Sequence, residues 1–169
     1  MQGITLRPES CADAPAIHAV TEAAFTNAPH AAHTEQFIVA ALRRAGALEV
    51  SLVAELSSEI VGHVAVSPVT LSDGSAGWFG LGPISVLPEH QGRGIGSRLM
   101  EESLRRLRTR GAAGCVLVGD PRFYTRFGFR SHTALAYPGV PAEVVLALAF
   151  GGTVPQATVT FHPAFGAQS

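Results

Sequence analysis

Apolar residues near the N-terminus recur at the spacing of one helix face. They predict a helix over residues 10–25, with Ser and Asp three positions apart as in a capping box, although a proline at position 15 leaves Asp13 as an alternative start. A second amphipathic helix is predicted over residues 35–44, ended by Gly46. Residues 26–33 between them contain Asn, Pro and His and predict a loop.

The remaining apolar runs are short and predict strands. Residues 50–55 and 60–66 have the spacing of an antiparallel hairpin, and residues 77–86 form a further run. A helical pattern follows, then a buried run at 114–119, so this part of the chain predicts one parallel βαβ crossover. Asp120 and the proline after it suit the cap and first turn of a short helix. Two further strands are predicted at 143–150 and 157–161.

Between the strand at 77–86 and the following helix lie three glycines at alternate positions: Gly92, Gly94 and Gly96. Glycine adopts positive φ and lets backbone N–H groups converge, and a helix N-terminus adds donors and a positive dipole end. The pattern therefore favours binding of a phosphate or pyrophosphate, with Arg93 adding charge, over a merely tight connection. A P-loop is excluded because no lysine follows the glycines. A dinucleotide fold stays an alternative, although the G-x-G-x-G spacing departs from its fingerprint.

Two segments resemble a known family. Residues 86–96, V-x-P-x-x-Q-G-R-G-I-G, are similar to the acetyl-CoA signature Q/R-x-x-G-x-G/A of the GNAT N-acetyltransferase superfamily. About 30 residues later, F-Y-T-R-F-G-F at 123–129 resembles the family's Y-x-[KR]-x-G-F segment. The Gly-Asp-Pro link at 119–121 looks like that of a bacterial branch of predicted N-acetyltransferases.

The resemblance implies a fold and an activity. It implies one α/β GNAT domain over residues 1–169, with a mixed central β-sheet flanked by helices, that moves an acetyl group from acetyl-CoA to a primary amine. Direct attack in a ternary complex is expected, because no activated nucleophile is visible. Two other classes of protein stay open as alternatives: a non-catalytic acyl-CoA-binding or sensing module, and a dinucleotide-binding oxidoreductase.

The resemblance also implies which residues bind acetyl-CoA. The backbone of three strand residues is expected to pair with the pantetheine arm, and the glycine turn and the first helical residues to hold the pyrophosphate. The implied set is Ile84, Ser85, Val86, Gln91, Gly92, Arg93, Gly94, Ile95, Gly96 and Ser97.

Tyr124 is the candidate general acid, because a phenol with a pKa near 10 stays protonated at neutral pH and donates to a departing thiolate. The other interpretation is an aromatic side chain that only packs between helix and sheet. The chain lacks the Asn that usually precedes this Tyr in the family. Glu35 is the first candidate general base, with His63, Glu89 and a water relay as alternatives.

Composition limits the remaining possibilities. The chain has 169 residues, 47% of them hydrophobic, and a net charge of −1, which gives no basic footprint for nucleic acid or an anionic membrane. We expect a cytoplasmic protein without a metal site, in which Cys11 and Cys115 are both buried. The family resemblance implies a small-molecule or peptide amine as the acceptor. The C-terminal strands are expected to close its pocket or to form a homodimer contact.

Overall fold

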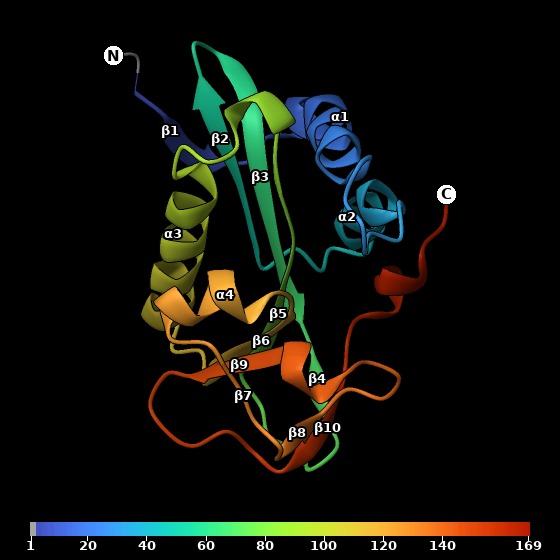
Figure 1. Cartoon of the computed structure of the whole chain (residues 1–169), viewed down its shortest axis with the longest axis vertical. Helices are drawn as coiled ribbons and strands as arrows, with labels where there is room; N and C mark the ends of the chain where they lie inside the picture. Colours follow the sequence, from blue (N-terminus) through green and yellow to red (C-terminus); the bar gives the residue numbers. More distant parts are fainter. Residues whose placement is uncertain (1–2) are drawn as a thin grey trace.

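The computed structural model describes residues 3–169 and contains a seven-stranded mixed sheet (Figure 1). The strand order is β1-β2-β3-β5-β6-β9-β7. The bounds are β1 (Thr5–Pro8), β2 (Val50–Leu56), β3 (Glu59–Pro68), β5 (Trp78–Val86), β6 (Gly114–Val118), β7 (Arg130–Ser131) and β9 (Val145–Ala149). A second, three-stranded sheet has the order β4-β10-β8, with β4 (Thr70–Leu71), β8 (Leu135–Ala136) and β10 (Ala157–Thr160).

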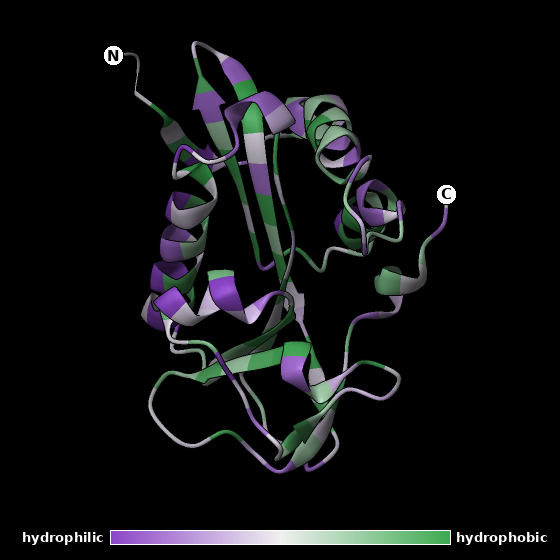
Figure 2. Cartoon of the chain, viewed as in Figure 1, coloured by the Kyte–Doolittle hydropathy of each residue, from purple (hydrophilic) through white to green (hydrophobic). Residues whose placement is uncertain are grey.

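Helices cover both faces of the large sheet. Helix α3 (Ile95–Thr109) packs on β2 and β3 from one face, whereas α1 (Ala14–Phe25) and α2 (Glu35–Arg44) lie on the other (Figure 1). Figure 2 shows hydrophobic residues concentrated in the strands and on the inner side of α3. The remaining helical segments are α4 (Pro121–Tyr124) and 3₁₀ turns at Cys11–Asp13, Pro88–His90, Thr125–Phe127, Ala142–Val144 and Pro163–Gly166.

The predicted local elements are present. The capping box of Ser10 and Asp13 forms both of its bonds, and α1 follows it. Strands β2 and β3 make the predicted antiparallel hairpin, with positive φ at Ser57 and Ser58 as a two-residue turn between twisted strands requires. Asp120 caps α4 by accepting a hydrogen bond from the Arg122 N–H.

Strands β5 and β6 are parallel and joined by α3, as predicted, but they pair over only three residues. The register runs from Trp78 opposite Gly114 to Gly80 opposite Val116. Beyond Gly80, β5 pairs only with β3, and its register shifts by one extra residue at the cis Gly82-Pro83 bond. The two parallel strands therefore separate, and in the described part of the chain one edge of β5 has no strand partner along Ile84–Val86.

Two predictions about local environment are wrong. Cys115 is buried, but Cys11 is exposed, because it begins the 3₁₀ turn ahead of α1. The strand expected from residue 143 begins at Val145, because the chain after Pro141 makes a 3₁₀ turn first.

Candidate active site

A cavity of about 470 Å³ opens at the glycine turn between β5 and α3. Gly92 and Gly94 have φ of 75° and 82°, a conformation that side chains disfavour. A Cβ added at either position would meet no atom within 4 Å, so both glycines border open space. Helix α3 begins at Ile95, which directs its unpaired first-turn N–H groups to the same place.

Most residues of the predicted acetyl-CoA set line this cavity. They are Ile84, Val86, Gln91, Gly92, Gly94, Ile95, Gly96 and Ser97. The Gln91 side-chain amide donates to the Val86 carbonyl at 3.0 Å and so braces the turn. Ser85 and Arg93 are not among the lining residues: the Ser85 side chain is buried, and Arg93 is exposed.

Three further residues of this cavity were not predicted: His90, Phe123 and Arg126. The Arg126 guanidinium lies 4.9 Å from the centroid of the Phe123 ring, a cation–π contact across the end of α4. Arg126 occupies the Lys/Arg position of the second motif, so the motif itself could have identified Arg126 as a residue of this cavity.

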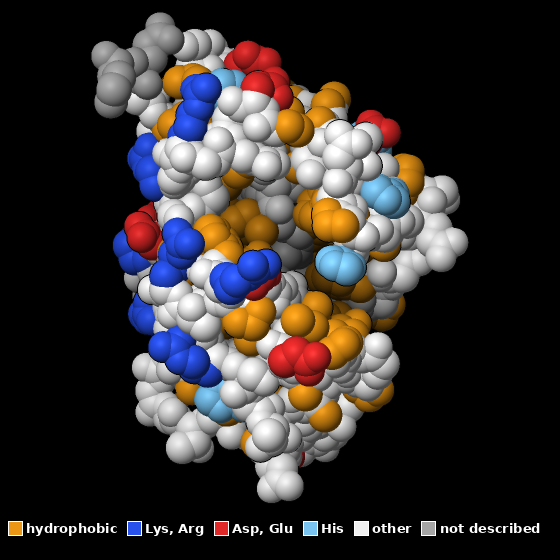
Figure 3. Space-filling view, in the orientation of Figure 1, with side chains coloured by type: hydrophobic (Ala, Val, Ile, Leu, Met, Phe, Trp, Pro, Cys, Tyr) orange, Lys and Arg blue, Asp and Glu red, His pale blue; other side chains and the backbone are white. Residues whose placement is uncertain are grey.

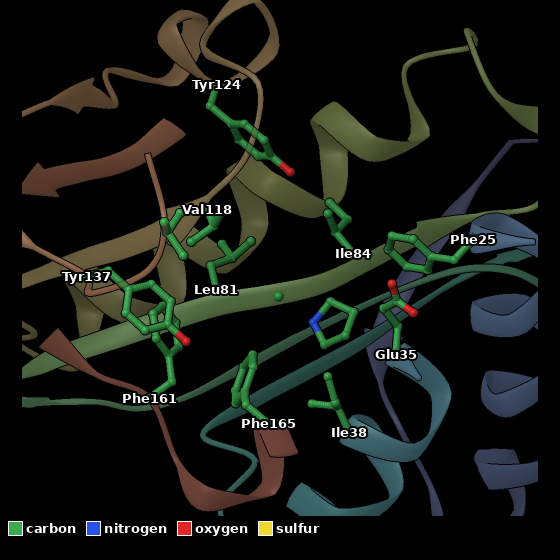
Figure 4. Close-up of a pocket in the computed structure, with 13 residues that line it drawn as sticks. Phe25, Glu35, Ile38, Leu81, Ile84, Val118, Tyr124, Tyr137, Phe161 and Phe165 are labelled. Carbon is green, nitrogen blue, oxygen red and sulfur yellow. The ribbon is translucent and has the colours of Figure 1, made fainter. Parts of the chain in front are cut away.

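A second cavity, of about 390 Å³, lies where β5 has left β6. Side chains from α1, α2, β5, β6, α4 and the C-terminal segment line it, and most are apolar or aromatic (Figure 4). The space-filling view shows this face hollowed, with hydrophobic side chains along the hollow (Figure 3). The two cavities share Ile84. Phe161 and Phe165 belong to the lining, so the C-terminal segment forms part of the wall.

Tyr124 lines the second cavity, and its hydroxyl points toward the Ile84 side of it (Figure 4). Burial, with a smaller effect from the Asp120 carboxylate, raises the pKa of Tyr124 to about 12. The ring lies against Gly119, where an added Cβ would stand 2.3 Å from Cε2. With that pKa the phenol is protonated near neutral pH, so it can donate a hydrogen bond into the cavity.

Glu35 enters the second cavity from the first turn of α2 and is only 9% exposed. One carboxylate oxygen, Oε1, accepts a hydrogen bond from the Ala32 N–H at 3.0 Å. The other, Oε2, is buried and finds no partner in the described part of the chain. A buried carboxylate oxygen without a partner is costly, which makes it a ready acceptor for a ligand's N–H.

The other candidate bases lie outside this cavity. His63 is fully buried, its Nε2 is 2.8 Å from the Ser51 hydroxyl, and burial lowers its pKa. Glu89 is exposed in the 3₁₀ turn at Pro88–His90. Neither residue lines the cavity that holds Tyr124 and Glu35.

Residues 47–131 match the family model described as acetyltransferase (GNAT) domain. The chain belongs to the GNAT acetyltransferase family. It is 35% identical over 125 residues to YhbS of Escherichia coli (strain K12), described as an uncharacterized N-acetyltransferase, and the match covers 73% of this chain and 72% of YhbS.

Two solved structures of GNAT proteins resemble this one over nearly the whole chain. A GNAT family acetyltransferase from Brucella melitensis, in complex with acetyl-CoA, has a TM-score of 0.87 and 45% identity, covering 98% of this chain and 99% of that one. YhbS from Escherichia coli, in complex with CoA, has a TM-score of 0.87 and 29% identity, and the match covers 100% of this chain and 95% of that one. The predicted family and GNAT fold are confirmed, and the dinucleotide-binding alternative is set aside.

Within residues 3–169, no group of three or more His, Cys, Asp or Glu side chains is arranged to hold a metal ion. In the same range, every helix is too short or too polar to cross a bilayer.

Proposed function

We propose that this protein transfers an acetyl group from acetyl-CoA to a primary amine within a ternary complex. The observation that carries the proposal is the pair of cavities that meet at Ile84, where β5 separates from β6. One cavity has the glycine turn and a helix N-terminus, which suit a pyrophosphate. The other has a phenol and a carboxylate, which suit proton movements around an amine.

Acetyl-CoA is assigned to the glycine-turn cavity. The N–H groups at Gln91–Gly96 and the start of α3 bind its pyrophosphate, and the unpaired edge of Ile84–Val86 bonds its pantetheine arm as an added strand would. The assignment is supported by the acetyl-CoA and CoA complexes of the two similar GNAT structures. Arg126 and Phe123 close the cavity from the side of α4.

In the proposed reaction the amine nitrogen attacks the thioester carbon, and the carbon–sulfur bond then breaks. Glu35 accepts the proton that the nitrogen loses, and Tyr124 donates a hydrogen bond to the departing sulfur. A thiol has a pKa near 8.5, and the pKa of Tyr124 is raised to about 12, so a complete proton transfer from phenol to thiolate is uphill. The phenol therefore acts mainly by stabilising the charge that develops on sulfur, and the proton that Glu35 takes from the nitrogen passes on to the thiolate, which restores the carboxylate and gives free CoA thiol.

A direct test is the release of free CoA thiol from acetyl-CoA when amines are offered. Acetyl-CoA, unlike NAD, should raise the melting temperature, since a ligand at 100 times its Kd adds about 2.7 kcal/mol to stability. Amine-dependent thiol release should accompany that binding. Stabilisation without turnover on any amine would favour the second candidate, a non-catalytic acyl-CoA-binding module. A melting temperature that rises with NAD but not with CoA would contradict both candidate functions.

A further inference from the structure

We infer that the acetyl acceptor is a small monoamine with an aromatic or apolar body. Polyamines and peptide N-termini are the amine classes that this cavity excludes. The inference deepens the proposed function and rests on it. It comes from three features of the second cavity: the chemistry of its wall, the single charge in its lining, and the place of that charge relative to Ile84.

The wall of the cavity is an aromatic series supplied by the C-terminal third of the chain. The ring centroids of Tyr137 and Phe161 are 5.0 Å apart, and those of Phe161 and Phe165 are also 5.0 Å apart. Val118, at the end of β6, is 45% exposed and lines the same cavity. Such a surface gains free energy when an apolar group covers it, at about 25 cal/mol for each Å² removed from water.

Within residues 3–169, Glu35 is the only charged side chain that lines the second cavity. Its buried Oε2 has no partner within residues 3–169, and an ammonium or amine N–H would satisfy it. A polyamine brings several cationic groups, and only one of them would find a carboxylate here. A peptide terminus brings amide groups that the aromatic wall leaves without hydrogen bonds, which weakens its binding.

The charge lies at the end of the cavity where the reaction would occur. Figure 4 shows Glu35 on the Ile84 side of the cavity, with Tyr137 and Phe161 on the opposite side. An amine held by Glu35 would therefore lie on the same side of the cavity as Ile84, which both cavities share, and its body would extend toward the aromatic wall. The volume, about 390 Å³, is near the lower end of the roughly 300–1,000 Å³ of ligand pockets, which suits a small acceptor.

The first experiment compares acceptors in steady state with acetyl-CoA. Phenethylamine, spermidine and a neutral tripeptide with a free N-terminus are the three probes, and kcat/KM for phenethylamine should exceed the other two by at least about tenfold. A fourth reaction pairs octanoyl-CoA with spermidine. It tests whether the apolar cavity holds a long acyl chain, and not the body of the amine, because an apolar cavity beside the acyl site also suits such a chain. A higher kcat/KM for spermidine, for the peptide or for the octanoyl reaction overturns the inference and leaves the proposed function standing.

Matched variants link the preference to the wall. Phe165→Ala should raise the KM for phenethylamine by about tenfold and leave the Kd for acetyl-CoA unchanged, because Phe165 lines only the second cavity of the two. Phe37→Ala is the control: the same change on α2, at a half-buried ring that contacts His18 and lines neither cavity. Equal effects of the two variants on phenethylamine would contradict the inference.

Binding separates the inference from the proposed function. Calorimetry on the CoA-loaded protein should show phenethylamine binding more tightly than 2-phenylethanol, and Glu35→Gln should remove that difference while it preserves side-chain size. If phenethylamine binds in this way but no amine of any class is acetylated, the ligand class stands and the proposed transfer fails. If phenethylamine neither binds nor reacts while acetyl-CoA binds, the acceptor inference is wrong.

Discussion

Gly119→Ala should reduce turnover by moving Tyr124, although residue 119 itself lies outside both cavities. An added Cβ would stand 2.3 Å from Cε2 of the Tyr124 ring and 2.9 Å from Cδ2. Carbon atoms that are not bonded pack at about 3.5–4.0 Å, so the ring must retreat by about 1 Å. The main chain has no comparable freedom, because Gly119 N–H donates to the Val144 carbonyl at 3.0 Å.

The ring's neighbours make that movement costly. Phe123 and Phe129 meet Tyr124 edge-on, with centroids 4.9 Å and 6.3 Å away. Overpacking of this kind typically costs about 1–3 kcal/mol of stability. A catalytic group misplaced by about 1 Å costs about 10²-fold in rate, so kcat should fall by that order while the Kd for acetyl-CoA changes little.

Steady-state kinetics, calorimetric titration with acetyl-CoA and thermal melting together test this prediction. Gly151→Ala is the control, because Gly151 is exposed and a Cβ there meets nothing within 4 Å. In the Gly119→Ala background, Tyr124→Phe should lower kcat little further, since both changes remove the same interaction. A parent-like kcat in Gly119→Ala, with melting lowered as expected, would refute the claim that the position of the phenol matters.

Three other predictions concern the donor, the turn and acid stability. Tyr124→Phe alone should lower kcat by about 10² with little change in KM, and an unchanged rate with chemistry limiting would leave only the packing role. Gly94→Val should abolish acetyl-CoA binding in calorimetry while circular dichroism stays native. Gly96→Ala, whose Cβ would stand at an ordinary 3.8 Å from the Phe123 ring, should weaken binding less. Burial raises the pKa of Glu9, but hydrogen bonds with Arg43, His63 and Ser51 outweigh burial and hold this pKa below its usual 4.5. The stability that the ionised Glu9 contributes is therefore present above about pH 4.5 and is lost as the pH falls. Urea titrations at pH 6 and pH 3 should therefore show a smaller acid loss for Glu9→Gln than for the parent protein.

The elements that the sequence predicts well are those formed by local interactions. The β2–β3 hairpin closes through two residues, and Asp120 caps α4 by bonding an N–H two positions on. The register shift between β3 and β5 falls at Gly82-Pro83, and a glycine followed by a proline inside a strand is a local signal of such an irregularity. Most of the glycine-turn cavity was also predicted, because its residues are nearly consecutive along the chain.

The aromatic wall of the second cavity had no comparable signal in the sequence. Tyr137, Phe161 and Phe165 reach the cavity only because β10 pairs with β4 and β8, and β4 comes from the middle of the chain. Pairing between two-residue and four-residue strands far apart in sequence leaves no periodic pattern to detect. Glu35 was identified only as a candidate base, and its unpartnered oxygen depends on how the 26–33 loop turns before α2.

The match to the GNAT family model spans the whole lining of the glycine-turn cavity but only about half of the lining of the second cavity. Residues 47–131 contain the glycine turn, Tyr124 and Arg126, whereas Phe25, Glu35, Tyr137, Phe161 and Phe165 lie outside that span. Under the proposed function, the donor site lies within that span and part of the acceptor site lies outside it, so we expect relatives that agree over residues 47–131 to differ in the amine that they accept. A chimera that carries residues 132–169 of this chain on a relative's framework is expected to keep the relative's donor and to acquire this protein's aromatic wall.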